Sequence, residues 1–217
     1  MIPAFSTSHV LPPYGGDDPA ERYLSSPYET TLSEIYERFG HTPERIELIK
    51  GLISYRRALR EVGITTGYQL IDGSFTENCE SHRGRPPSDV DLITFAYLPV
   101  HGPERSPFVN AHRNLFDQGL TKAAFRCDAY FVDLSKEPRL VVEDTCYWYG
   151  LFSHQRDTFL WKGMLSIPLM SDDDEVWRIL QGMHVALPAA NDDAVEADPI
   201  VAAADIQIEA NRGDANA

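Results

Sequence analysis

The chain has 217 residues, of which 43% are hydrophobic and 24% are charged, and its formal net charge is -14 at pH 7. The acidic balance excludes binding of nucleic acid through the whole surface, because clustered Lys and Arg drive that binding. Three unevenly spaced cysteines do not form a disulfide framework and favour a reducing compartment. The sequence shows no secretory leader and no apolar run of about 18 residues, so we predict a cytoplasmic protein with no membrane partner.

The two ends of the chain differ in composition from its centre. Residues 1–27 contain five prolines and the pair Gly15-Gly16, which predict an extended segment and not a helix. Beyond Pro188 the sequence is rich in Ala, Asp, Asn and Glu, which predicts a disordered acidic tail. We therefore predict an extended N-terminal arm over residues 1–28, one folded domain over residues 29–185 and a tail over residues 186–217.

Two helices are predicted after the arm. Apolar residues recur at helical spacing from Leu32 to Phe39, and Gly40 stands where a glycine ends a helix. Thr42 and Pro43 then suit the N-cap and first turn of a second helix that extends to residue 62. This helix carries a dense set of cations: Arg45, Lys50, Arg56, Arg57 and Arg60. We interpret them as a solvated face paired with carboxylates, and a face turned to a phosphate chain is the alternative.

The most informative stretch contains two predicted strands, over residues 68–71 and 90–95. The first is followed by Gly73-Ser74, and the second carries Asp89 and Asp91 two residues apart, so both carboxylates would project from one face. A hard divalent cation relieves their repulsion, and Mg²⁺ is usually completed by substrate phosphates. Glycine allows close approach of the backbone to a ligand, while Ser74 and exposed N–H groups can hold phosphate oxygens. The stretch therefore predicts a site for a metal-bound triphosphate.

The segment between Ser74 and Ser88 is longer than an ordinary loop and contains Arg83 and Arg85. One interpretation is that one of these arginines covers the triphosphate and neutralises the leaving pyrophosphate, because the guanidinium has a fixed charge and forked donors. The other interpretation is that both arginines keep a mobile loop soluble.

The remaining sequence predicts a series of shorter elements: a helix over residues 110–118 closed by Gly119, a strand over 123–134, a helix over 141–152, a strand over 163–169 and a helix over 171–181. On the strand, Asp128 shares one face with Tyr130, while Asp133 lies on the opposite face. The aromatic residues of the helix over 141–152 are typical of a core or an interface.

These residues resemble the polymerase-β-type nucleotidyltransferase superfamily, whose pattern is a helix, a strand, Gly-Ser and then Asp-x-Asp on the next strand. The chain is similar to a small bacterial branch through four motifs: Leu11-Pro12-Pro13, Asp72-Gly73-Ser74-Phe75, Asp89-Val90-Asp91 and Lys162-Gly163. The resemblance covers roughly residues 10–180 and implies an α/β fold in which helices pack on a mixed β-sheet.

The resemblance also implies an activity, the Mg²⁺-dependent transfer of a nucleotidyl group from a nucleoside triphosphate to a hydroxyl acceptor. Two Mg²⁺ ions would be held by Asp89, Asp91 and Asp128, with Asp133 as the rival third ligand. The nucleotide would be contacted by a further set of residues: Gly73, Ser74, Arg83, Arg85, Ser88 and Lys162.

The acceptor is not identified by the residues, since relatives modify RNA ends, proteins and nucleotides. Small bacterial members often belong to toxin-antitoxin or antiviral defence systems, which implies a protein partner encoded nearby. The alternative is a catalytically inactive binding module, or antitoxin-like partner, whose acidic surface suits a basic protein. Retention of costly paired carboxylates argues against that alternative.

Overall fold

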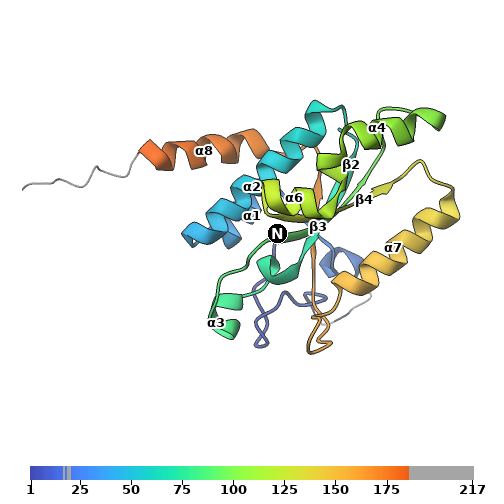
Figure 1. The fold of residues 1–217 in the computed structure, drawn as a ribbon. Coiled ribbons are helices and arrows are strands. Elements are labelled where there is room, and N and C mark those ends of the chain that lie inside the picture. The colour runs from blue at the N-terminus through green and yellow to red at the C-terminus, as the bar shows by residue number, and fades with distance from the viewer. Residues whose placement is uncertain (17, 19–20, 186–217) are drawn as a thin grey trace, which may run out of the picture.

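A five-stranded mixed sheet forms the centre of the computed structural model, which describes residues 1–16, 18 and 21–185 (Figure 1). The predicted tail over residues 186–217 lies outside the described residues. The strand order is β1-β5-β2-β3-β4. The strands are β1 (Tyr28–Glu29), β2 (Gly67–Asp72), β3 (Val90–Ala96), β4 (Cys127–Asp133) and β5 (Leu165–Pro168). β2 is antiparallel to β3 and β5, while β4 runs parallel to β3 and β1 runs parallel to β5.

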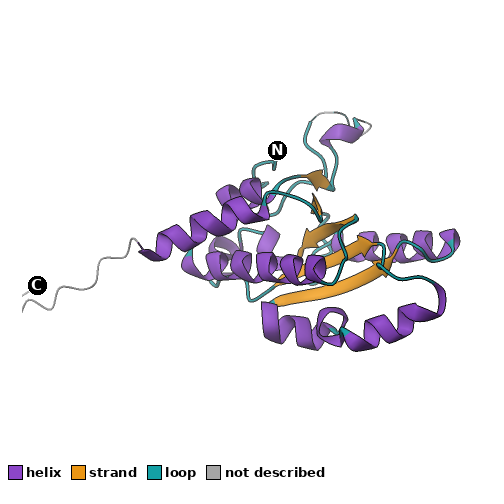
Figure 2. Ribbon diagram, turned by 90° about the horizontal axis from the view of Figure 1, so that it is seen from above, coloured by secondary structure: helices purple, strands orange, loops and turns teal. Residues whose placement is uncertain are grey.

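Helices flank the strands on both sides in Figure 2, so the expected α/β fold with a mixed sheet is confirmed. The α-helices of the described residues are α1 (Leu32–Phe39), α2 (Pro43–Glu61), α3 (Cys79–Arg83), α4 (Arg105–Ala111), α5 (Arg113–Phe116), α6 (Gln118–Phe125), α7 (Pro138–Phe152) and α8 (Asp173–Val185). Three short 3-10 helices are η1 (Arg22–Leu24), η2 (Gly73–Thr76) and η3 (Gly102–Glu104). No helix of this described part is both long and apolar enough to cross a membrane.

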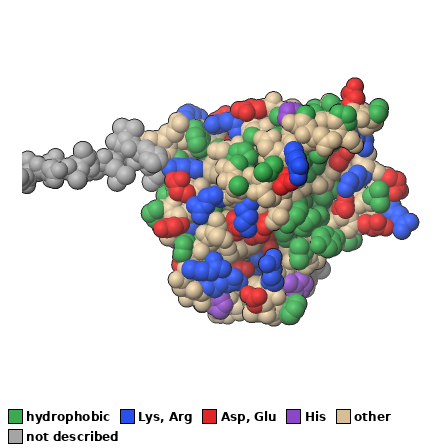
Figure 3. All heavy atoms as spheres, viewed as in Figure 1, with side chains coloured by type: hydrophobic (Ala, Val, Ile, Leu, Met, Phe, Trp, Pro, Cys, Tyr) green, Lys and Arg blue, Asp and Glu red, His purple; other side chains and the backbone are tan. Residues whose placement is uncertain are grey.

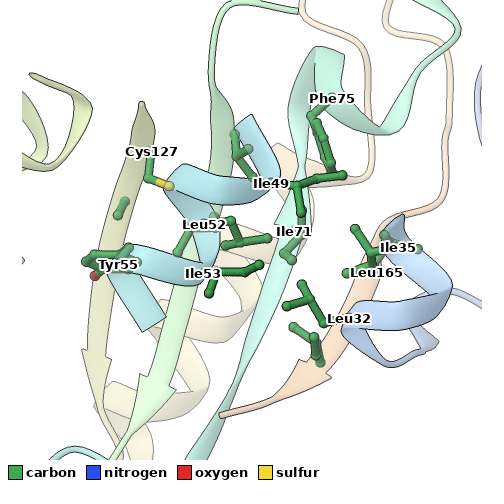
Figure 4. Close-up of a cluster of buried hydrophobic side chains, with 14 of the residues drawn as sticks. Leu32, Ile35, Ile49, Leu52, Ile53, Tyr55, Ile71, Phe75, Cys127 and Leu165 are labelled. Carbon is green, nitrogen blue, oxygen red and sulfur yellow. The ribbon is translucent and has the colours of Figure 1, made fainter. Parts of the chain in front are cut away.

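The main core lies between α1, α2 and one face of the sheet. Figure 4 shows Ile49, Leu52 and Ile53 of α2 beside Ile71 of β2, and all four side chains are fully buried. Burial of each such side chain stabilises the fold by roughly 1.5–3 kcal/mol. Helix α2 begins as predicted, because the Thr42 hydroxyl accepts a hydrogen bond from the Arg45 N–H at 3.3 Å.

The opposite face of the sheet is covered mainly by α7. Its smaller apolar cluster contains Phe152 of α7 and side chains from β2, β3, β4 and the residue before β5: Leu70, Ile93, Phe95, Val132 and Met164. Trp148 of α7 also packs on Tyr130 of β4, with ring centroids 4.4 Å apart. This second face is therefore apolar toward one end and, as described below, charged toward the other.

The predicted elements over residues 141–152, 163–169 and 171–181 are α7, β5 and α8 with shifted bounds, and two further predictions differ more. The predicted strand over residues 123–134 begins only at Cys127, because α6 continues to Phe125 and ends at Arg126, which has a left-handed φ of 57°. Gly119 does not end a helix over residues 110–118; it lies in the first turn of α6. The stronger signal is Asp117, whose carboxylate caps that turn by accepting hydrogen bonds from the N–H groups of Gly119 and Leu120.

The N-terminal arm adds a strand to the sheet, since β1 pairs with β5. The Gly163 N–H donates to the Leu11 carbonyl at 2.8 Å, and a Cβ at Gly163 would collide with the Pro12 carbonyl. Two motifs that are far apart in the sequence, Leu11-Pro12-Pro13 and Lys162-Gly163, are thus in direct contact.

The burial of two cations of α2 contradicts the prediction that they are solvated. Arg45 and Arg56 are fully buried, so the expected solvated face is wrong for both of them. Arg45 binds the Glu80 carboxylate and the carbonyls of Phe75 and Glu77, while Arg56 binds the Asp173 carboxylate. These arginines therefore fasten α3 and α8 to α2, and the alternative phosphate-binding role does not apply to them either.

Candidate functional site

Three neighbouring strands carry aspartates at the same level of the sheet. In the strand register, Asp91 of β3 lies opposite Asp72 of β2 on one side and Asp128 of β4 on the other. Adjacent strands are only about 4.8 Å apart, and like charges directly opposite each other destabilise a sheet. Asp89 adds a fourth carboxylate immediately before β3. We call these four residues the aspartate row, and they concentrate negative charge at one end of the α7 face.

The electrostatics of the aspartate row reflect this crowding. Burial raises the pKa of Asp91 to about 7, with further contributions from the negative charges of Asp89, Asp72 and Asp128. Burial also raises the pKa of Asp72 to about 6, although the nearby Lys162 ammonium opposes that increase. Near neutral pH the row therefore favours either a bound proton or a bound cation.

Lys122 of α6 supplies one such cation. Its Nζ lies 2.5 Å from Asp89 Oδ2 and 3.7 Å from Asp128 Oδ2. The hydrogen bond to Asp89 is the main reason that the pKa of Lys122 is raised. Gln118, one turn earlier on α6, donates a hydrogen bond to Asp128 Oδ1 at 2.7 Å. One face of α6 therefore positions the carboxylates of Asp89 and Asp128.

Lys162 is buried beneath the Gly-Ser turn. Its Nζ lies 3.0 Å from Asp72 Oδ1 and 3.0 Å from Glu77 Oε1, and it donates to the Gly73 carbonyl at 3.3 Å. Burial lowers the pKa of Lys162, but the carboxylates of Asp72 and Glu77 outweigh this effect and raise it. The predicted nucleotide contact of Lys162 stays a prediction, and its visible role is to hold the turn in place.

The turn itself requires glycine at position 73. Gly73 has a φ of 77°, and a Cβ there would collide with the carboxylate of Asp91. The backbone of the turn therefore lies directly against the central carboxylate of the row. Ser74 and Ser88 also line the cavity. The Ser88 hydroxyl donates to Asp89 Oδ1 at 3.1 Å.

The segment between Ser74 and Ser88 is structured, which corrects the expectation of a loop. It contains the end of η2 and all of α3, and buried Arg45 holds it through Glu80. Arg83 and Arg85 both line the cavity, and Arg83 Nη2 lies 3.1 Å from Glu77 Oε2. A sequence pattern with few apolar residues did not indicate this helix, because its anchor is a buried arginine on a distant element.

A cavity of about 640 Å³ opens in front of the aspartate row. It is lined by the aspartate row, the Gly-Ser turn, the arginines near α3, Tyr130 of β4, the end of α7 and the segment after it. Between α3 and α7, Figure 3 shows acidic and basic side chains next to a group of hydrophobic ones. This volume lies within the range of about 300–1,000 Å³ that is usual for ligand sites.

The two rivals for the third metal ligand lie in different places. Asp128 lines this cavity together with Asp89 and Asp91, whereas Asp133 lines a second cavity and accepts a hydrogen bond from the Ser135 N–H at 2.9 Å. Alternation along β4 separates them, because Cys127 and Ala129, which share the Asp133 face, belong to the main core.

The donor atoms of the aspartate row suit Mg²⁺. Carboxylate oxygens are its preferred protein ligands, and glycine at position 73 lets the backbone of the turn approach the Asp91 carboxylate closely. Within residues 1–16, 18 and 21–185, however, no group of three or more His, Cys, Asp or Glu side chains is arranged to hold a metal ion. The predicted metal set of Asp89, Asp91 and Asp128 therefore stays a prediction, and substrate phosphates would have to complete it.

Sequence reasoning missed several residues of this site. Asp72 was visible only as part of a motif, and its alignment with Asp91 depends on the strand register. Lys122 and Gln118 lie on a helix with unremarkable periodicity, while Glu77 sits in a segment expected to be a loop. The spacing of Gln118 and Lys122, four residues apart and shortly before Asp128, was the one available signal.

A protein-family model described as a family of unknown function (DUF6932) matches residues 3–168. The chain belongs to this family. The DUF6932 match extends from the arm to β5 and includes the whole aspartate row, the Gly-Ser turn and both lysines. No curated protein and no solved structure matches the chain. The description of DUF6932 assigns no activity, so the site itself has to supply the functional argument.

Proposed function

We propose that this DUF6932 protein is a Mg²⁺-dependent nucleotidyltransferase. The observation that carries the proposal is the aspartate row beside a Gly-Ser turn in which glycine is sterically required. Crowded carboxylates raise the free energy of the folded state unless a cation or a proton compensates them, so their presence around an open cavity favours a role in binding.

In the proposed site, Asp89, Asp91 and Asp128 would hold two Mg²⁺ ions. The ions would supply compensating charge for the triphosphate and for the developing negative charge of the transition state. Gly73 and Ser74 would hold the β- and γ-phosphates, and Lys162 would fix this turn through Asp72 and Glu77. Arg83 and Arg85 lie at the same cavity and would balance charge on the leaving pyrophosphate.

The reaction transfers one nucleotidyl group. The acceptor oxygen attacks the α-phosphorus, and the bond from that phosphorus to the bridging oxygen of the β-phosphate breaks, so pyrophosphate leaves. The acceptor hydroxyl loses its proton, for which we assign Asp128 as the receiving carboxylate. Asp128 suits this role because Gln118 orients it at the end of the row. The acceptor classes that we propose are an RNA end, a protein and a nucleotide, in a bacterial toxin-antitoxin or antiviral setting.

The test is incubation of the purified protein with each α-labelled nucleoside triphosphate, Mg²⁺ and total RNA or cell lysate. We expect the label to appear on an acceptor together with released pyrophosphate. Asp91→Asn should reduce transfer at least about a hundredfold, because loss of even an outer-sphere partner of a metal ligand costs about 10–100-fold. The matched control is Asp174→Asn, because the Asp174 carboxylate of the wild type is exposed and pairs with Arg57. Equal transfer by the Asp91→Asn protein, or no transfer with any triphosphate, would contradict the proposal.

One observation favours a second candidate, an inactive nucleotidyltransferase-fold module that binds a partner protein. Lys122 already places an ammonium group between Asp89 and Asp128, so part of the row is neutralised without a metal. Calorimetric titration with ATP separates the two functions. Binding that requires Mg²⁺ supports the enzyme, whereas binding indifferent to Mg²⁺, or none, supports the module.

A further inference from the structure

The segment that follows α7 forms a compact hairpin at the cavity, which we call the 153–162 hairpin. Its two ends are joined by the Lys162 N–H, which donates to the Ser153 carbonyl at 2.8 Å, and by a bridge between His154 and Trp161. Its tip is closed by the Phe159 N–H, which donates to the Gln155 carbonyl at 3.0 Å. The backbone of the hairpin is therefore fixed by its own hydrogen bonds.

The hairpin is also tied to the Gly-Ser turn. Gln155 is buried, and its Nε2 donates to Glu77 Oε2 at 2.9 Å while its Oε1 accepts from Thr158 Oγ1 at 2.7 Å. The other carboxylate oxygen of Glu77 binds Lys162, which reaches Asp72. One buried carboxylate thus contacts both the hairpin and the lysine that supports the turn.

Phe159 at the tip of the hairpin is exposed in an unusual way. Its side chain lines the cavity, the residue is 80% exposed, and its backbone has a left-handed φ of 55°. A bulky residue other than glycine adopts this conformation only at a cost, and such outliers cluster at ligand sites. The backbone conformation of Phe159 is therefore unfavourable, and burial of its ring in the core does not compensate for it. The ring is instead exposed to solvent at the cavity.

The cavity is chemically divided. Its lining contains the carboxylates of the aspartate row and the Gly-Ser turn, and it also contains the aromatic rings of Tyr130, Trp148 and Phe159. Tyr130 and Trp148 are engaged with each other, with ring centroids 4.4 Å apart. Among these three aromatic rings, Phe159 is the one in no ring contact of the described residues. A ligand that matches both kinds of lining has an anionic phosphate end and a flat aromatic end.

We infer that Phe159 is a stacking platform for the base of the nucleoside triphosphate. The inference rests on the proposed function and adds the binding site of the base to it. Every nucleobase offers a π face, so the platform selects for a base and not for one particular base. The tie between the hairpin and the turn through Glu77 sets the distance between base and phosphates.

The experiment compares two ligands, ATP and inorganic tripolyphosphate, which lacks a base. Their dissociation constants are measured by calorimetry with Mg²⁺ for the wild type, Phe159→Ala and Phe159→Trp. We expect Phe159→Ala to weaken ATP binding by roughly 5- to 150-fold, the range for loss of one base–aromatic stack, and to leave tripolyphosphate binding unchanged. Phe159→Trp should retain ATP binding and should show quenching of its added indole fluorescence.

Tyr23→Ala is the matched control, because Tyr23 is also 80% exposed but does not line the cavity. Unchanged ATP affinity in Phe159→Ala would overturn the inference alone, provided that the wild type binds ATP. Equal weakening of ATP and tripolyphosphate would overturn it as well, since the hairpin would then act on the phosphates. A wild type that binds neither ligand would overturn both the inference and the proposed function.

Discussion

Two clusters of charged side chains, one buried and one partly buried, lie on opposite faces of the same sheet, and they are built differently. On the α2 face, Arg56 donates to the Asp173 carboxylate, to Gln69 Oε1 at 2.8 Å and to the Pro168 carbonyl at 2.7 Å. On the α7 face, Asp91 is surrounded by other carboxylates, and no ion pair of the described residues includes it. A satisfied cluster needs nothing more from solution, whereas an unsatisfied one beside a cavity is prepared for a ligand.

Breaking the satisfied cluster should give the largest loss of stability. Arg56→Met leaves Asp173 buried with Arg60 as its remaining ionic partner among the described residues, and removal of one member of a buried pair costs about 3–5 kcal/mol. The matched control is Arg57→Met, because Arg57 forms an exposed pair with Asp174 and should cost less than about 1 kcal/mol. Urea unfolding measures both values. Equal losses in the two variants would mean that the buried cluster contributes nothing special.

Neutralising a carboxylate of the unsatisfied cluster should increase stability instead of lowering it. The pKa of Asp91 is raised from 3.8 to about 7, so the folded state retains a proton that the unfolded state releases. The free energy of unfolding is therefore undiminished by Asp91 below about pH 4, and it falls as the pH rises from 4 toward 7. Asparagine mimics the protonated carboxyl group. At pH 8 without Mg²⁺, the free energy of unfolding of Asp91→Asn should therefore exceed that of the wild type by on the order of 2–4 kcal/mol.

The comparison for this variant is its own pH series. The gain of Asp91→Asn over the wild type should disappear near pH 4. A stability difference that stays constant from pH 4 to pH 8 would mean that Asp91 is not under electrostatic stress.

A smaller effect is expected from Lys122, which partly balances the row. Lys122→Met removes a half-exposed partner of Asp89, so it should lower stability in EDTA by no more than about 1 kcal/mol. Because the lysine no longer competes for the carboxylates, Mg²⁺ should raise the melting temperature of the variant more than that of the wild type. Lys136→Met, which disturbs an exposed pair with Asp144, is the control. Identical Mg²⁺ titrations for all three proteins would refute the competition.

The last prediction concerns a satisfied carboxylate outside both clusters. Burial raises the pKa of Asp172, but hydrogen bonds from Ser33, Ser171 and the backbone of α1 outweigh this and lower it to about 2. This contribution to stability is present above about pH 4 and is lost as the pH falls through 2. Asp172→Ala should therefore cost about 1 kcal/mol at pH 7, as for a helix cap, and little at pH 2. A pH-independent cost would point to packing instead.

The sequence predicted those features that depend on local chemistry. The start of α2 follows from Thr42 and Pro43, and the pairing of Asp89 with Asp91 follows from strand alternation. The burial of Arg45 and Arg56 was not predicted, although both lie on the apolar stripe of α2 with Ile49 and Leu52. A cation on an apolar stripe was the available signal, but its partners lie on α3 and α8.

What could not be predicted depends on long-range register. Asp72 faces Asp91 only because β2 and β3 pair at that position, and Lys122 reaches Asp89 only because α6 packs beside β3 and β4. The spacing within one segment carries no information about such alignments. The same is true of Phe159, whose significance depends on the hairpin being tied to Glu77.

The strand order β1-β5-β2-β3-β4 also has a consequence for biosynthesis. Among the strands of the described residues, β5 is the last to leave the ribosome, and it inserts between β1 and β2. A nascent chain that has not reached Leu165 exposes the edge of β2 and leaves the arm without its partner strand, a state that invites intermolecular pairing. Lys162 arrives in the same late stretch, so the turn that carries Gly73 acquires its support only when nearly the whole domain has been translated.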